Sequence, residues 1–550
     1  MCGLNNMKKL TISSSKLILI LTIYFSTVLN LSFWRYLYNN LDITNFRVAC
    51  FAFSTCFFIA IPLFLLFNLT IIKRLAKPFT IILLILSSST NFMMFKYGVY
   101  IDKDMMQNVM ETNLREATDF FTFSLLFWVF ITGIIPSILL IITKIQYQPL
   151  KIELRRRFKY SIICLLIASV LGGLLYKEYV SFVRNNGPIR SLINVFNYTV
   201  GTINQVKRMR LAKKQFVELD SSPQIVDYAK NGQLYTVLIF IVGETARASS
   251  FSLGGYTRKT NPLLEKQDIA YFKNTTSCGT STAISIPCIF SHQNRNDFNS
   301  TEARFTQNLV DLAQKAGYKV IWKENDDGCK NVCNRVENIE IMKDIKNPQY
   351  CHENYCLDES LLVDLEKILA DTKQNTFIIL HTQGSHGPSY YQRYPDEFKQ
   401  FTPTCDTGDI QNCSTEQIIN TYDNTILYTD FIISSTIDIV KKFPQFKSGI
   451  MYVSDHGESL GENNMFLHGM PYKIAPAEQI NVPMLVWLNE NMKTSDYIDY
   501  DCLKEQASSN TYSHDNIFHS LLRLLKIKTS VYNSDYDLFK TCSTEELSKP

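Results

Sequence analysis

The sequence has no internal repeat, no low-complexity tract and no run of basic residues interleaved with aromatic ones. The first two absences exclude repeat architectures and long disordered regions, and the third argues against a nucleic-acid partner. Histidine is scarce, with 8 residues in 550, so a place where histidines gather is informative. Apolar residues are abundant instead: 46% of the chain is hydrophobic and 13% aromatic, which is high for a wholly soluble protein.

Five apolar segments in the first third of the chain are long enough to cross a bilayer. They cover about residues 17–37, 48–68, 79–97, 120–143 and 160–176. The first follows Lys8, Lys9 and Lys16, but no small-residue cleavage site comes after it, so we expect an uncleaved span and not a signal peptide. These segments predict a multi-pass, membrane-embedded protein.

Basic residues in the short loops predict the orientation of the spans. They gather in the N-terminal tail, the second loop and the fourth loop, as Lys8, Lys9, Lys73, Arg74, Lys77, Lys151, Arg155, Arg156, Arg157 and Lys159. The first and third loops carry scattered charges of both signs. Since the basic side is cytoplasmic, five crossings place the large C-terminal domain outside the cytoplasm.

The cysteines support this orientation independently. Four of the 14 lie in the membrane half, as Cys2, Cys50, Cys56 and Cys164, and the other ten all lie in the C-terminal domain. Closely spaced, even-numbered cysteines are typical of disulfides formed in an oxidising compartment, whereas structural zinc would need different spacing and partners. Short loops predict Cys278–Cys288, Cys329–Cys333, Cys351–Cys356 and Cys405–Cys413, and elimination leaves Cys502–Cys542.

We divide the chain into a transmembrane domain of five helices (1–176), a connector (177–215) and a catalytic domain (216–550). The connector, mixed apolar and basic, fits either interfacial helices or a solvated linker helix. The C-terminal domain alternates strand-like and helix-like stretches, which predicts an α/β fold with a mostly parallel sheet. Strands are expected at 234–242, 319–322, 376–380, 450–453 and 484–488, and helices at 304–316, 359–370, 416–442 and 515–525.

Acidic and histidine side chains follow three of these expected strands. They are Glu244 after the first, His381 and His386 after the third, and Asp455, His456, Glu458 and His468 after the fourth. Ligands bind beyond the carboxyl ends of strands in open α/β sheets. A single loop histidine is more often structural, but here four of the eight gather with two carboxylates. This donor mixture suits zinc, so the pattern predicts a metal site.

A hydroxyl-rich segment between Cys278 and Cys288 offers a nucleophile for this site. A hydroxyl becomes a strong nucleophile only when a metal ion or a base removes its proton. The candidates are Thr280, Ser281, Thr282 and Ser285, and spacing does not choose among them. The alternative is a surface loop rich in serine and threonine.

Together, the segments 243–247, 277–288, 385–388 and 454–462 resemble the phosphoethanolamine transferases, the lipid A-modifying family that includes the mobile colistin-resistance enzymes. The resemblance spans nearly the whole chain. It implies an α-helical five-span membrane domain joined to an α/β domain like those of alkaline phosphatases and sulfatases. It further implies a location in the Gram-negative inner membrane with the catalytic domain in the periplasm. We expect a monomer.

The resemblance also implies residue roles. Thr282 would be the nucleophile, and a tightly bound zinc ion (Zn2+) would have the ligands Thr282, Glu244, Asp455 and His456. His386 and His468 match positions that bind a second zinc or the substrate phosphate, His386 also assisting catalysis. His381 lies near the substrate, and Lys330 matches a residue that contacts the phosphoryl group. Glu458 sits beside the zinc ligands, without an assigned role.

One motif of the membrane half fits the same family. Asn108, Thr112 and Glu116 recur every four residues, which places them on one face of a helix. In the family, the matching residues help bind the ethanolamine lipid. Without the resemblance, this would be only a solvated helix face.

The implied reaction transfers phosphoethanolamine from phosphatidylethanolamine to a phosphate of lipid A in lipopolysaccharide, through a covalent intermediate on Thr282. The product carries an added ammonium, which would weaken the binding of polymyxins and other cationic peptides. Core heptose and periplasmic glucan stay open as other acceptors. A sulfatase is disfavoured because the Cys/Ser-x-Pro-x-Arg signature is missing at Thr282. A non-catalytic envelope sensor would be expected to have lost ligands, and all are intact.

Overall fold

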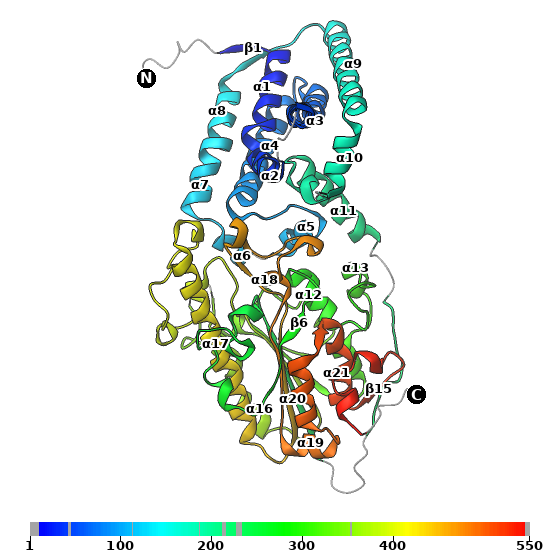
Figure 1. The fold of residues 1–550 in the computed structure, drawn as a ribbon, viewed down its shortest axis with the longest axis vertical. Coiled ribbons are helices and arrows are strands. Elements are labelled where there is room, and N and C mark those ends of the chain that lie inside the picture. Colours follow the sequence, from blue (N-terminus) through cyan, green and yellow to red (C-terminus); the bar gives the residue numbers. More distant parts are fainter. Residues whose placement is uncertain are drawn as a thin grey trace. The chain divides into compact units, whose positions relative to one another are not determined.

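The computed structural model describes residues 10–41, 46–112, 114–185, 187–211, 216–226, 234–352 and 355–544 (Figure 1). The chain packs as two units, a membrane unit of Met1–Met106 and Phe121–Ile203, and a globular unit of Gln107–Phe120 and Asn204–Pro550. Cys2, Lys8 and Lys9 lie outside the described residues. The expected division at residues 176 and 215 concerns the membrane boundary and stays a prediction.

The described part of the membrane unit contains five helices that are long and apolar enough to cross a membrane. Two are single helices, α3 (Phe46–Thr70) and α9 (Leu150–Leu174). The others combine shorter elements over Ser14–Asn40, Ala76–Tyr97 and Phe123–Ile142. Large apolar side chains such as Phe123 and Leu139 remain exposed on them, as expected of helices surrounded by lipid. The predicted five-helix membrane domain is confirmed.

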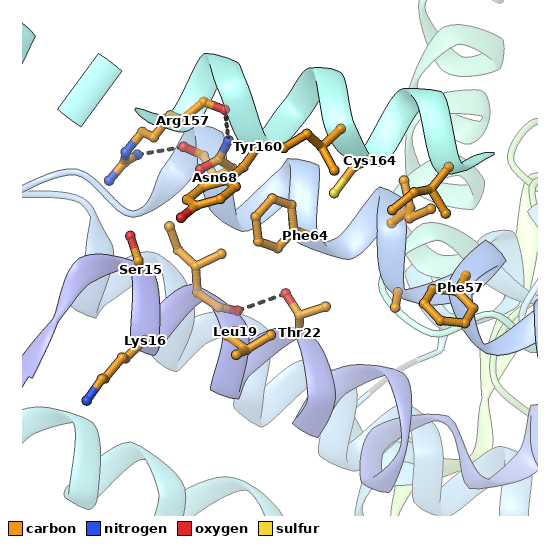
Figure 2. Close-up of a pocket in the computed structure, with 15 residues that line it drawn as sticks. Ser15, Lys16, Leu19, Thr22, Phe57, Phe64, Asn68, Arg157, Tyr160 and Cys164 are labelled. Carbon is orange, nitrogen blue, oxygen red and sulfur yellow. Dashed lines mark hydrogen bonds between the residues drawn. The ribbon is translucent and has the colours of Figure 1, made fainter. Parts of the chain in front are cut away.

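A cavity between α1 (Ser14–Ser26), α3 and α9 is lined mainly by apolar side chains (Figure 2). Its polar residues serve the helices themselves. The Thr22 hydroxyl donates to the Ile18 carbonyl at 2.8 Å, and the Asn68 amide donates to the Arg157 carbonyl at 3.0 Å. Thr22 and Asn68 therefore stabilise the helices that surround the cavity.

The expected connector is helical over α10 (Tyr176–Asn185), η4 (Gly187–Leu192) and α11 (Phe196–Leu211). Asn194, just before α11, is fully buried, and its amide donates to the carbonyls of Leu29 and Ser87, both at 2.7 Å. These bonds fix the start of α11 against the helices of the membrane unit. These contacts lie within the membrane unit, and the choice between interfacial helices and a solvated linker helix stays a prediction.

The globular unit is built on a seven-stranded sheet of order β5-β13-β10-β4-β9-β7-β8. The strands are β4 (Thr236–Gly243), β5 (Ala270–Phe272), β7 (Lys319–Glu324), β8 (Asn338–Ile341), β9 (Thr376–His381), β10 (Lys447–Ser454) and β13 (Met484–Leu488). The run from β10 to β8 is parallel, and β13 is antiparallel to both of its neighbours. The predicted, mostly parallel α/β sheet is confirmed. The continuous apolar runs of its central strands reflect burial on both faces.

Helices cover both faces of the sheet. Figure 1 shows α16 (Leu365–Ala370) and α17 (Thr415–Lys441) on one side, and α20 (Tyr500–Ser509) and α21 (Ile517–Leu524) on the other. The helices expected at 416–442 and 515–525 match α17 and α21 closely. The side chains of α21 form one continuous core with the sheet.

Two expected helices are broken in the structure. The stretch 304–316 forms a helix only over α14 (Leu309–Lys315), because Thr306 makes a bridge to Val217 and Asn308 begins the helix with a capping box. The stretch 359–370 is divided at Asp364, whose φ of 61° cannot continue a right-handed helix. Tertiary pairing and backbone conformation override helix propensity in both cases.

Disulfides connect all five predicted pairs of cysteines in the globular unit. Cys50, Cys56 and Cys164 are free cysteines in the described part of the membrane unit. The predicted cysteine framework is confirmed.

Candidate active site

The parallel strands deliver their last residues to one edge of the sheet. Ser454 of β10 pairs with Gly243 of β4, and Val242 of β4 pairs with His381 of β9. Glu324 of β7 is level with the same histidine. The loops that follow these strands therefore begin side by side, and the expected gathering of acidic and histidine side chains occurs there.

Glu244, Asp455 and His456 form a buried cluster at this edge, in which one ligand atom of each lies within 4.8 Å of the others. The Nε2 atom of His456 is 3.4 Å from Glu244 Oε1 and 3.3 Å from Asp455 Oδ2. The Thr282 hydroxyl lies 3.2 Å from Glu244 Oε2 and 3.4 Å from His456 Nε2. The structure thus brings together the four residues predicted for the first metal site.

The hydrogen bonds behind the cluster aim its ligand atoms inward. The Nδ1 atom of His456 lies 3.0 Å from the Gly457 carbonyl and donates to it, which leaves Nε2 directed at the cluster. Asp455 Oδ1 accepts the backbone N–H groups of Thr245 and His456, at 3.1 and 2.7 Å. Asp455 Oδ2 is buried and has no hydrogen-bond partner within the described residues. A buried carboxylate oxygen without a donor fits a cation site.

The protonation states of Glu244, Asp455 and His456 depend on one another. Burial, and next the charge of Glu244, raise the pKa of Asp455 well above its usual value. Burial also acts to raise the pKa of Glu244, but the neighbouring His456 outweighs it and holds that pKa well below its usual value. Two carboxylates this close cannot both be ionised without a compensating positive charge. A divalent cation would supply that charge.

Thr282 occupies the first position of α12 (Thr282–Ile289), after the cap residue Ser281. Two other candidate hydroxyls have structural partners: Thr280 donates to the Met470 carbonyl at 2.6 Å, and Ser285 accepts the Gly279 N–H at 3.1 Å. The hydroxyl of Thr282 faces the carboxylate–histidine cluster instead. Helix N-termini also attract anions through their free N–H groups. The geometry therefore favours Thr282 among the candidate nucleophiles.

Gly279 is required for the tight loop before α12. A Cβ atom at this position would lie 2.8 Å from Ile284 Cγ2 and 2.9 Å from Ile284 Cβ. The Cys278–Cys288 disulfide ties the start of the same loop to the end of the helix. Both features hold the Thr282 hydroxyl in place.

His386 and His468 lie beside the cluster. The His468 ring is 4.4 Å from the His456 ring and 5.4 Å from the His386 ring, measured between centroids. Glu458 orients His468, because its Oε2 lies 3.1 Å from His468 Nδ1 while its Oε1 accepts the Tyr390 hydroxyl at 3.0 Å. This arrangement gives Glu458 a positioning contact that the sequence did not reveal. The metal-binding or substrate-binding roles of the two histidines stay predictions.

Lys330 lies in the turn closed by the Cys329–Cys333 disulfide and donates to the Asp327 carbonyl at 3.0 Å. It is half-buried, and its charge acts on Glu324 and Asp326, helping to lower the pKa of each against the effect of burial. The lysine therefore lies near the sheet edge, as expected of a residue that contacts a phosphoryl group.

The segment predicted to bind the ethanolamine lipid belongs to the globular unit. Asn108 lies in α5 (Lys103–Glu111), and its carbonyl accepts both the N–H and the hydroxyl of Thr112 at 2.8 Å. The side chain of Glu116 lies outside the described residues. Buried Gln107 donates to the carbonyl of Ala283 at 3.2 Å. The segment is thereby attached to the residue after Thr282.

The sequence analysis did not single out Asp326, His514 or Gln107. Asp326 follows β7 as Asp455 follows β10, so the same strand-end argument could have found it. Buried His514 accepts the Cys278 N–H through Nδ1 at 3.1 Å and lies 3.0 Å from the Ser454 carbonyl through Nε2. It joins the loop of Thr282 to the strand of Asp455. Neither His514 nor Gln107 carries a sequence signal, because tertiary packing alone creates their contacts.

Comparisons with known proteins agree with this geometry. The sulfatase family matches residues 236–527, and the family described as phosphoethanolamine transferase EptA/EptB matches residues 59–209. The chain is 36% identical over 535 residues to phosphoethanolamine transferase EptA of Salmonella typhimurium, which covers 96% of each chain. It is 32% identical over 473 residues to phosphatidylethanolamine transferase Mcr-1 of Escherichia coli, covering 83% of this chain and 84% of the other.

A solved structure is similar over almost the full length. It is the integral membrane protein lipooligosaccharide phosphoethanolamine transferase A (EptA) from Neisseria meningitidis, with a TM-score of 0.94 and 34% identity. The match covers 98% of this chain and 100% of that chain. The similarity therefore includes both units of the molecule.

Proposed function

Because this chain belongs to the phosphoethanolamine transferase family, we propose that it moves phosphoethanolamine from phosphatidylethanolamine to a phosphate of lipid A through a covalent intermediate on Thr282. The observation that carries the proposal is the position of the Thr282 hydroxyl, at the start of α12 and 3.2 Å from Glu244. We further propose a monomer in the inner membrane of a Gram-negative bacterium, with the globular unit in the periplasm.

The donor set fits zinc, since it combines two carboxylates, an imidazole and a hydroxyl, and Asp455 Oδ2 has no hydrogen-bond partner among the described residues. Glu244, Asp455, His456 and Thr282 would hold the ion. When bound, it would lower the pKa of the Thr282 hydroxyl and neutralise charge on the phosphoryl group. The hydrogen bond from His456 Nδ1 to Gly457 keeps the imidazole in the tautomer that this role needs.

In the first half-reaction, the Thr282 oxygen attacks the phosphorus of the donor lipid. A bond forms between Thr282 Oγ1 and phosphorus, and the bond from phosphorus to the glycerol oxygen breaks. The proton that the Thr282 hydroxyl gives up is balanced by the proton with which diacylglycerol leaves, and His386 and His468 are the histidines beside His456 that can carry it between the two oxygens. The N–H groups of α12 and the ammonium of Lys330 stabilise the negative charge on the phosphoryl oxygens.

In the second half-reaction, an oxygen of the acceptor phosphate attacks the same phosphorus. The bond to Thr282 breaks, and the hydroxyl regains its proton. Phosphoethanolamine is thereby attached to the acceptor with its ammonium exposed, so the modified surface carries less net negative charge. Cells that make the product are expected to resist polymyxins and other cationic peptides.

Adduct mapping tests this proposal. Full-length protein in detergent is incubated with phosphatidylethanolamine, digested and analysed by mass spectrometry. We expect a peptide containing Thr282 that is heavier by one phosphoethanolamine unit. An adduct on Thr280, Ser281 or Ser285 would contradict the nucleophile assignment, and no adduct together with no released diacylglycerol would contradict the reaction.

The acceptor needs its own test. Mass spectrometry of lipid A from cells with and without the gene is expected to show phosphoethanolamine on lipid A only when the gene is present. Unmodified lipid A, with the group on core heptose or on a periplasmic glucan, would keep the chemistry and overturn the acceptor.

A further inference from the structure

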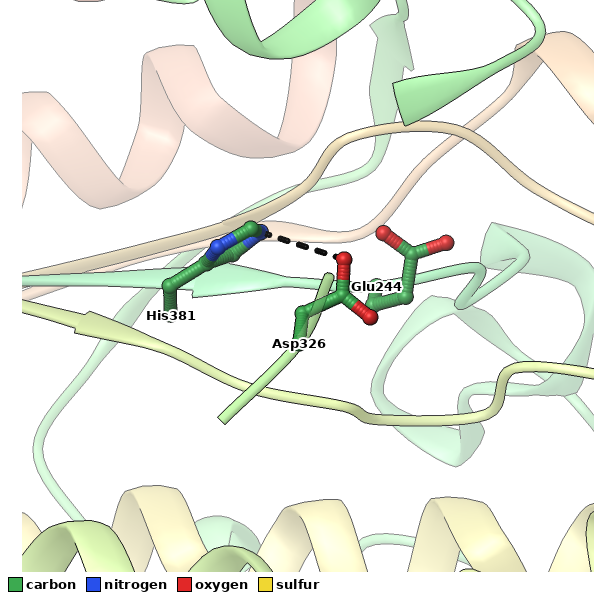
Figure 3. Close-up of side chains that lie close together, drawn as sticks. All are labelled: Glu244, Asp326 and His381. Carbon is green, nitrogen blue, oxygen red and sulfur yellow. Dashed lines mark ion pairs between the residues drawn. The ribbon is translucent and has the colours of Figure 1, made fainter. Parts of the chain in front are cut away.

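A second group of potential ligands lies at the same edge of the sheet. Glu244, Asp326 and His381 each offer a ligand atom within 4.8 Å of the other two, and all three side chains are buried (Figure 3). They come from the ends of β4, β7 and β9, which are adjacent parallel strands. The group shares Glu244 with the first cluster.

Hydrogen bonds fix the orientation of the His381 ring. Its Nδ1 atom lies 2.9 Å from Glu324 Oε2, which also accepts the Trp322 indole N–H at 2.9 Å. The other oxygen of Glu324 accepts the backbone N–H of Asp326 at 2.8 Å. Glu324 thus acts as an acceptor for several donors, so the Nδ1 atom of His381 carries a proton. A carboxylate behind a histidine is the usual support for an imidazole that binds a metal ion.

The opposite nitrogen of His381 has no hydrogen-bond partner among the described residues, and it forms a long ion pair with Asp326. Its Nε2 atom is fully buried without a hydrogen bond among the described residues, and Asp326 Oδ2 is 3.9 Å away, too far for one. A buried polar nitrogen is normally satisfied. Here it points toward two carboxylates across a gap that a cation would bridge.

Buried carboxylates gather around this group. Glu244, Glu324, Asp326 and Asp455 are all buried. Glu244 and Asp326 each offer an oxygen close to the His381 ring. A cation between these three side chains would have two carboxylates and an imidazole as ligands.

We propose that Glu244, Asp326 and His381 bind a second divalent cation, with Glu244 bridging it to the first. Two carboxylates and an imidazole suit Zn2+ or Mn2+, and carboxylates commonly bridge such pairs. The proposal rests on the proposed function, since Glu244 belongs to both sites. It assigns the second cation to different residues from His386 and His468, which the sequence analysis had favoured.

Metal stoichiometry tests the site without relying on turnover. Full-length protein in detergent is stripped with a chelator, titrated calorimetrically with Zn2+ and then with Mn2+, and analysed for bound metal after gel filtration. Wild type is expected to bind two ions. Asp326→Asn and His381→Ala are expected to lose one ion, and Glu244→Ala to lose both.

Two control variants separate this site from the alternatives. Asp327→Asn changes the neighbouring carboxylate, which pairs with Lys343, and should keep both ions. His468→Ala should also keep both, because it lies outside the proposed ligands. One ion in wild type, two ions in Asp326→Asn, or loss of an ion in His468→Ala would each overturn the second site.

Failure of this inference is distinguishable from failure of the proposed function. Wild type that binds one ion but still forms the Thr282 adduct would keep the reaction and remove the second site. Circular dichroism and the melting temperature are measured for every variant. If Asp326→Asn does not fold, His381→Ala and His468→Ala decide, because loss of one ion in His381→Ala alone supports the proposal and loss of one ion in His468→Ala alone overturns it.

Discussion

Arg157 of the membrane unit and Asp455 of the globular unit are both buried, but the Arg157 guanidinium has several hydrogen-bond acceptors whereas one oxygen of Asp455 has no hydrogen-bond donor among the described residues. The Arg157 guanidinium binds Glu153 at 3.0 Å and the carbonyls of Asn68 and Ile71. At the sheet edge, Asp455 Oδ2 and His381 Nε2 are buried and have no hydrogen-bond partner among the described residues. Satisfied buried polar groups hold the membrane helices together, whereas the unsatisfied acceptors that gather at the sheet edge fit a place for a cation.

The largest expected effect comes from removing the Thr282 hydroxyl, which faces the cluster at the sheet edge. Thr282→Ala is expected to lower transfer by about 10³-fold or more, because the covalent route is lost. Thr282→Ser should retain part of the activity, since the hydroxyl remains. Turnover of a fluorescent ethanolamine lipid measures both.

Ser285→Ala is the matched control for Thr282→Ala. It removes a neighbouring hydroxyl whose partner is the Gly279 N–H, so stability should fall while transfer persists. If Ser285→Ala abolished transfer and Thr282→Ala did not, the roles assigned to the two hydroxyls would be reversed.

Removing the Arg157 side chain should lower the stability of the protein and leave the transfer reaction unchanged. Arg157→Ala removes one of the two guanidinium partners of the buried Glu153 carboxylate, while Arg156 remains 2.6 Å away, so it is expected to cost about 1–3 kcal/mol of unfolding free energy. Metal content per folded molecule should not change. Thermal unfolding in detergent, with metal analysis of the folded fraction, checks both.

The double substitution Glu153→Gln with Arg157→Met sharpens the result. It removes both charges of this pair and leaves the charge of Arg156, whose side chain is 26% exposed, to water, so part of the lost stability should return. A double variant as unstable as Arg157→Ala would mean that the carbonyl contacts of Arg157, and not its ion pair, hold the helices together.

His514 provides a test based on pH. Burial lowers the pKa of His514 to about 3, from an ordinary value of 6.5, so the folded protein favours its neutral form. Its stabilising contribution is therefore complete above about pH 6.5 and is lost as the pH falls toward 3. In that window the loss is about 1.4 kcal/mol per pH unit, or about 2 kcal/mol at pH 5.

Substitution by glutamine isolates this effect. His514→Gln can still accept the Cys278 N–H and donate to the Ser454 carbonyl, but it does not titrate. Its stability should fall less steeply between pH 6.5 and 5 than that of wild type, as measured by melting temperature. Equal slopes for the two proteins would show that His514 does not take up the proton.

The features that could be predicted from the sequence are those written in local patterns. The length of the apolar segments predicted the five spans, and the acidic and histidine residues after the strands predicted the cluster of Glu244, Asp455 and His456. The short spacing between cysteines predicted the local disulfides. Strand β8 was not predicted because its residues are partly exposed and its apolar run is short. His381 illustrates the limit: its sequence position is clear, but its ring direction depends on Glu324, which tertiary packing brings to it.

The smallest expected effect concerns neighbouring residues of α5. Gln107→Ala removes buried hydrogen bonds to Ala283 and Ser300, so we expect a loss of about 1–3 kcal/mol in unfolding free energy. Asn108→Ala removes a half-buried side chain predicted to bind the donor lipid, and it should raise KM for that lipid with little change in melting temperature. The side chain of Gln107 forms its hydrogen bonds within the protein, as that of Arg157 does, whereas the side chain of Asn108 would form hydrogen bonds with the donor lipid. If Gln107→Ala instead raised KM for the donor lipid and left stability unchanged, Gln107 would be one of the residues that contact the lipid. Its structural role would then be refuted.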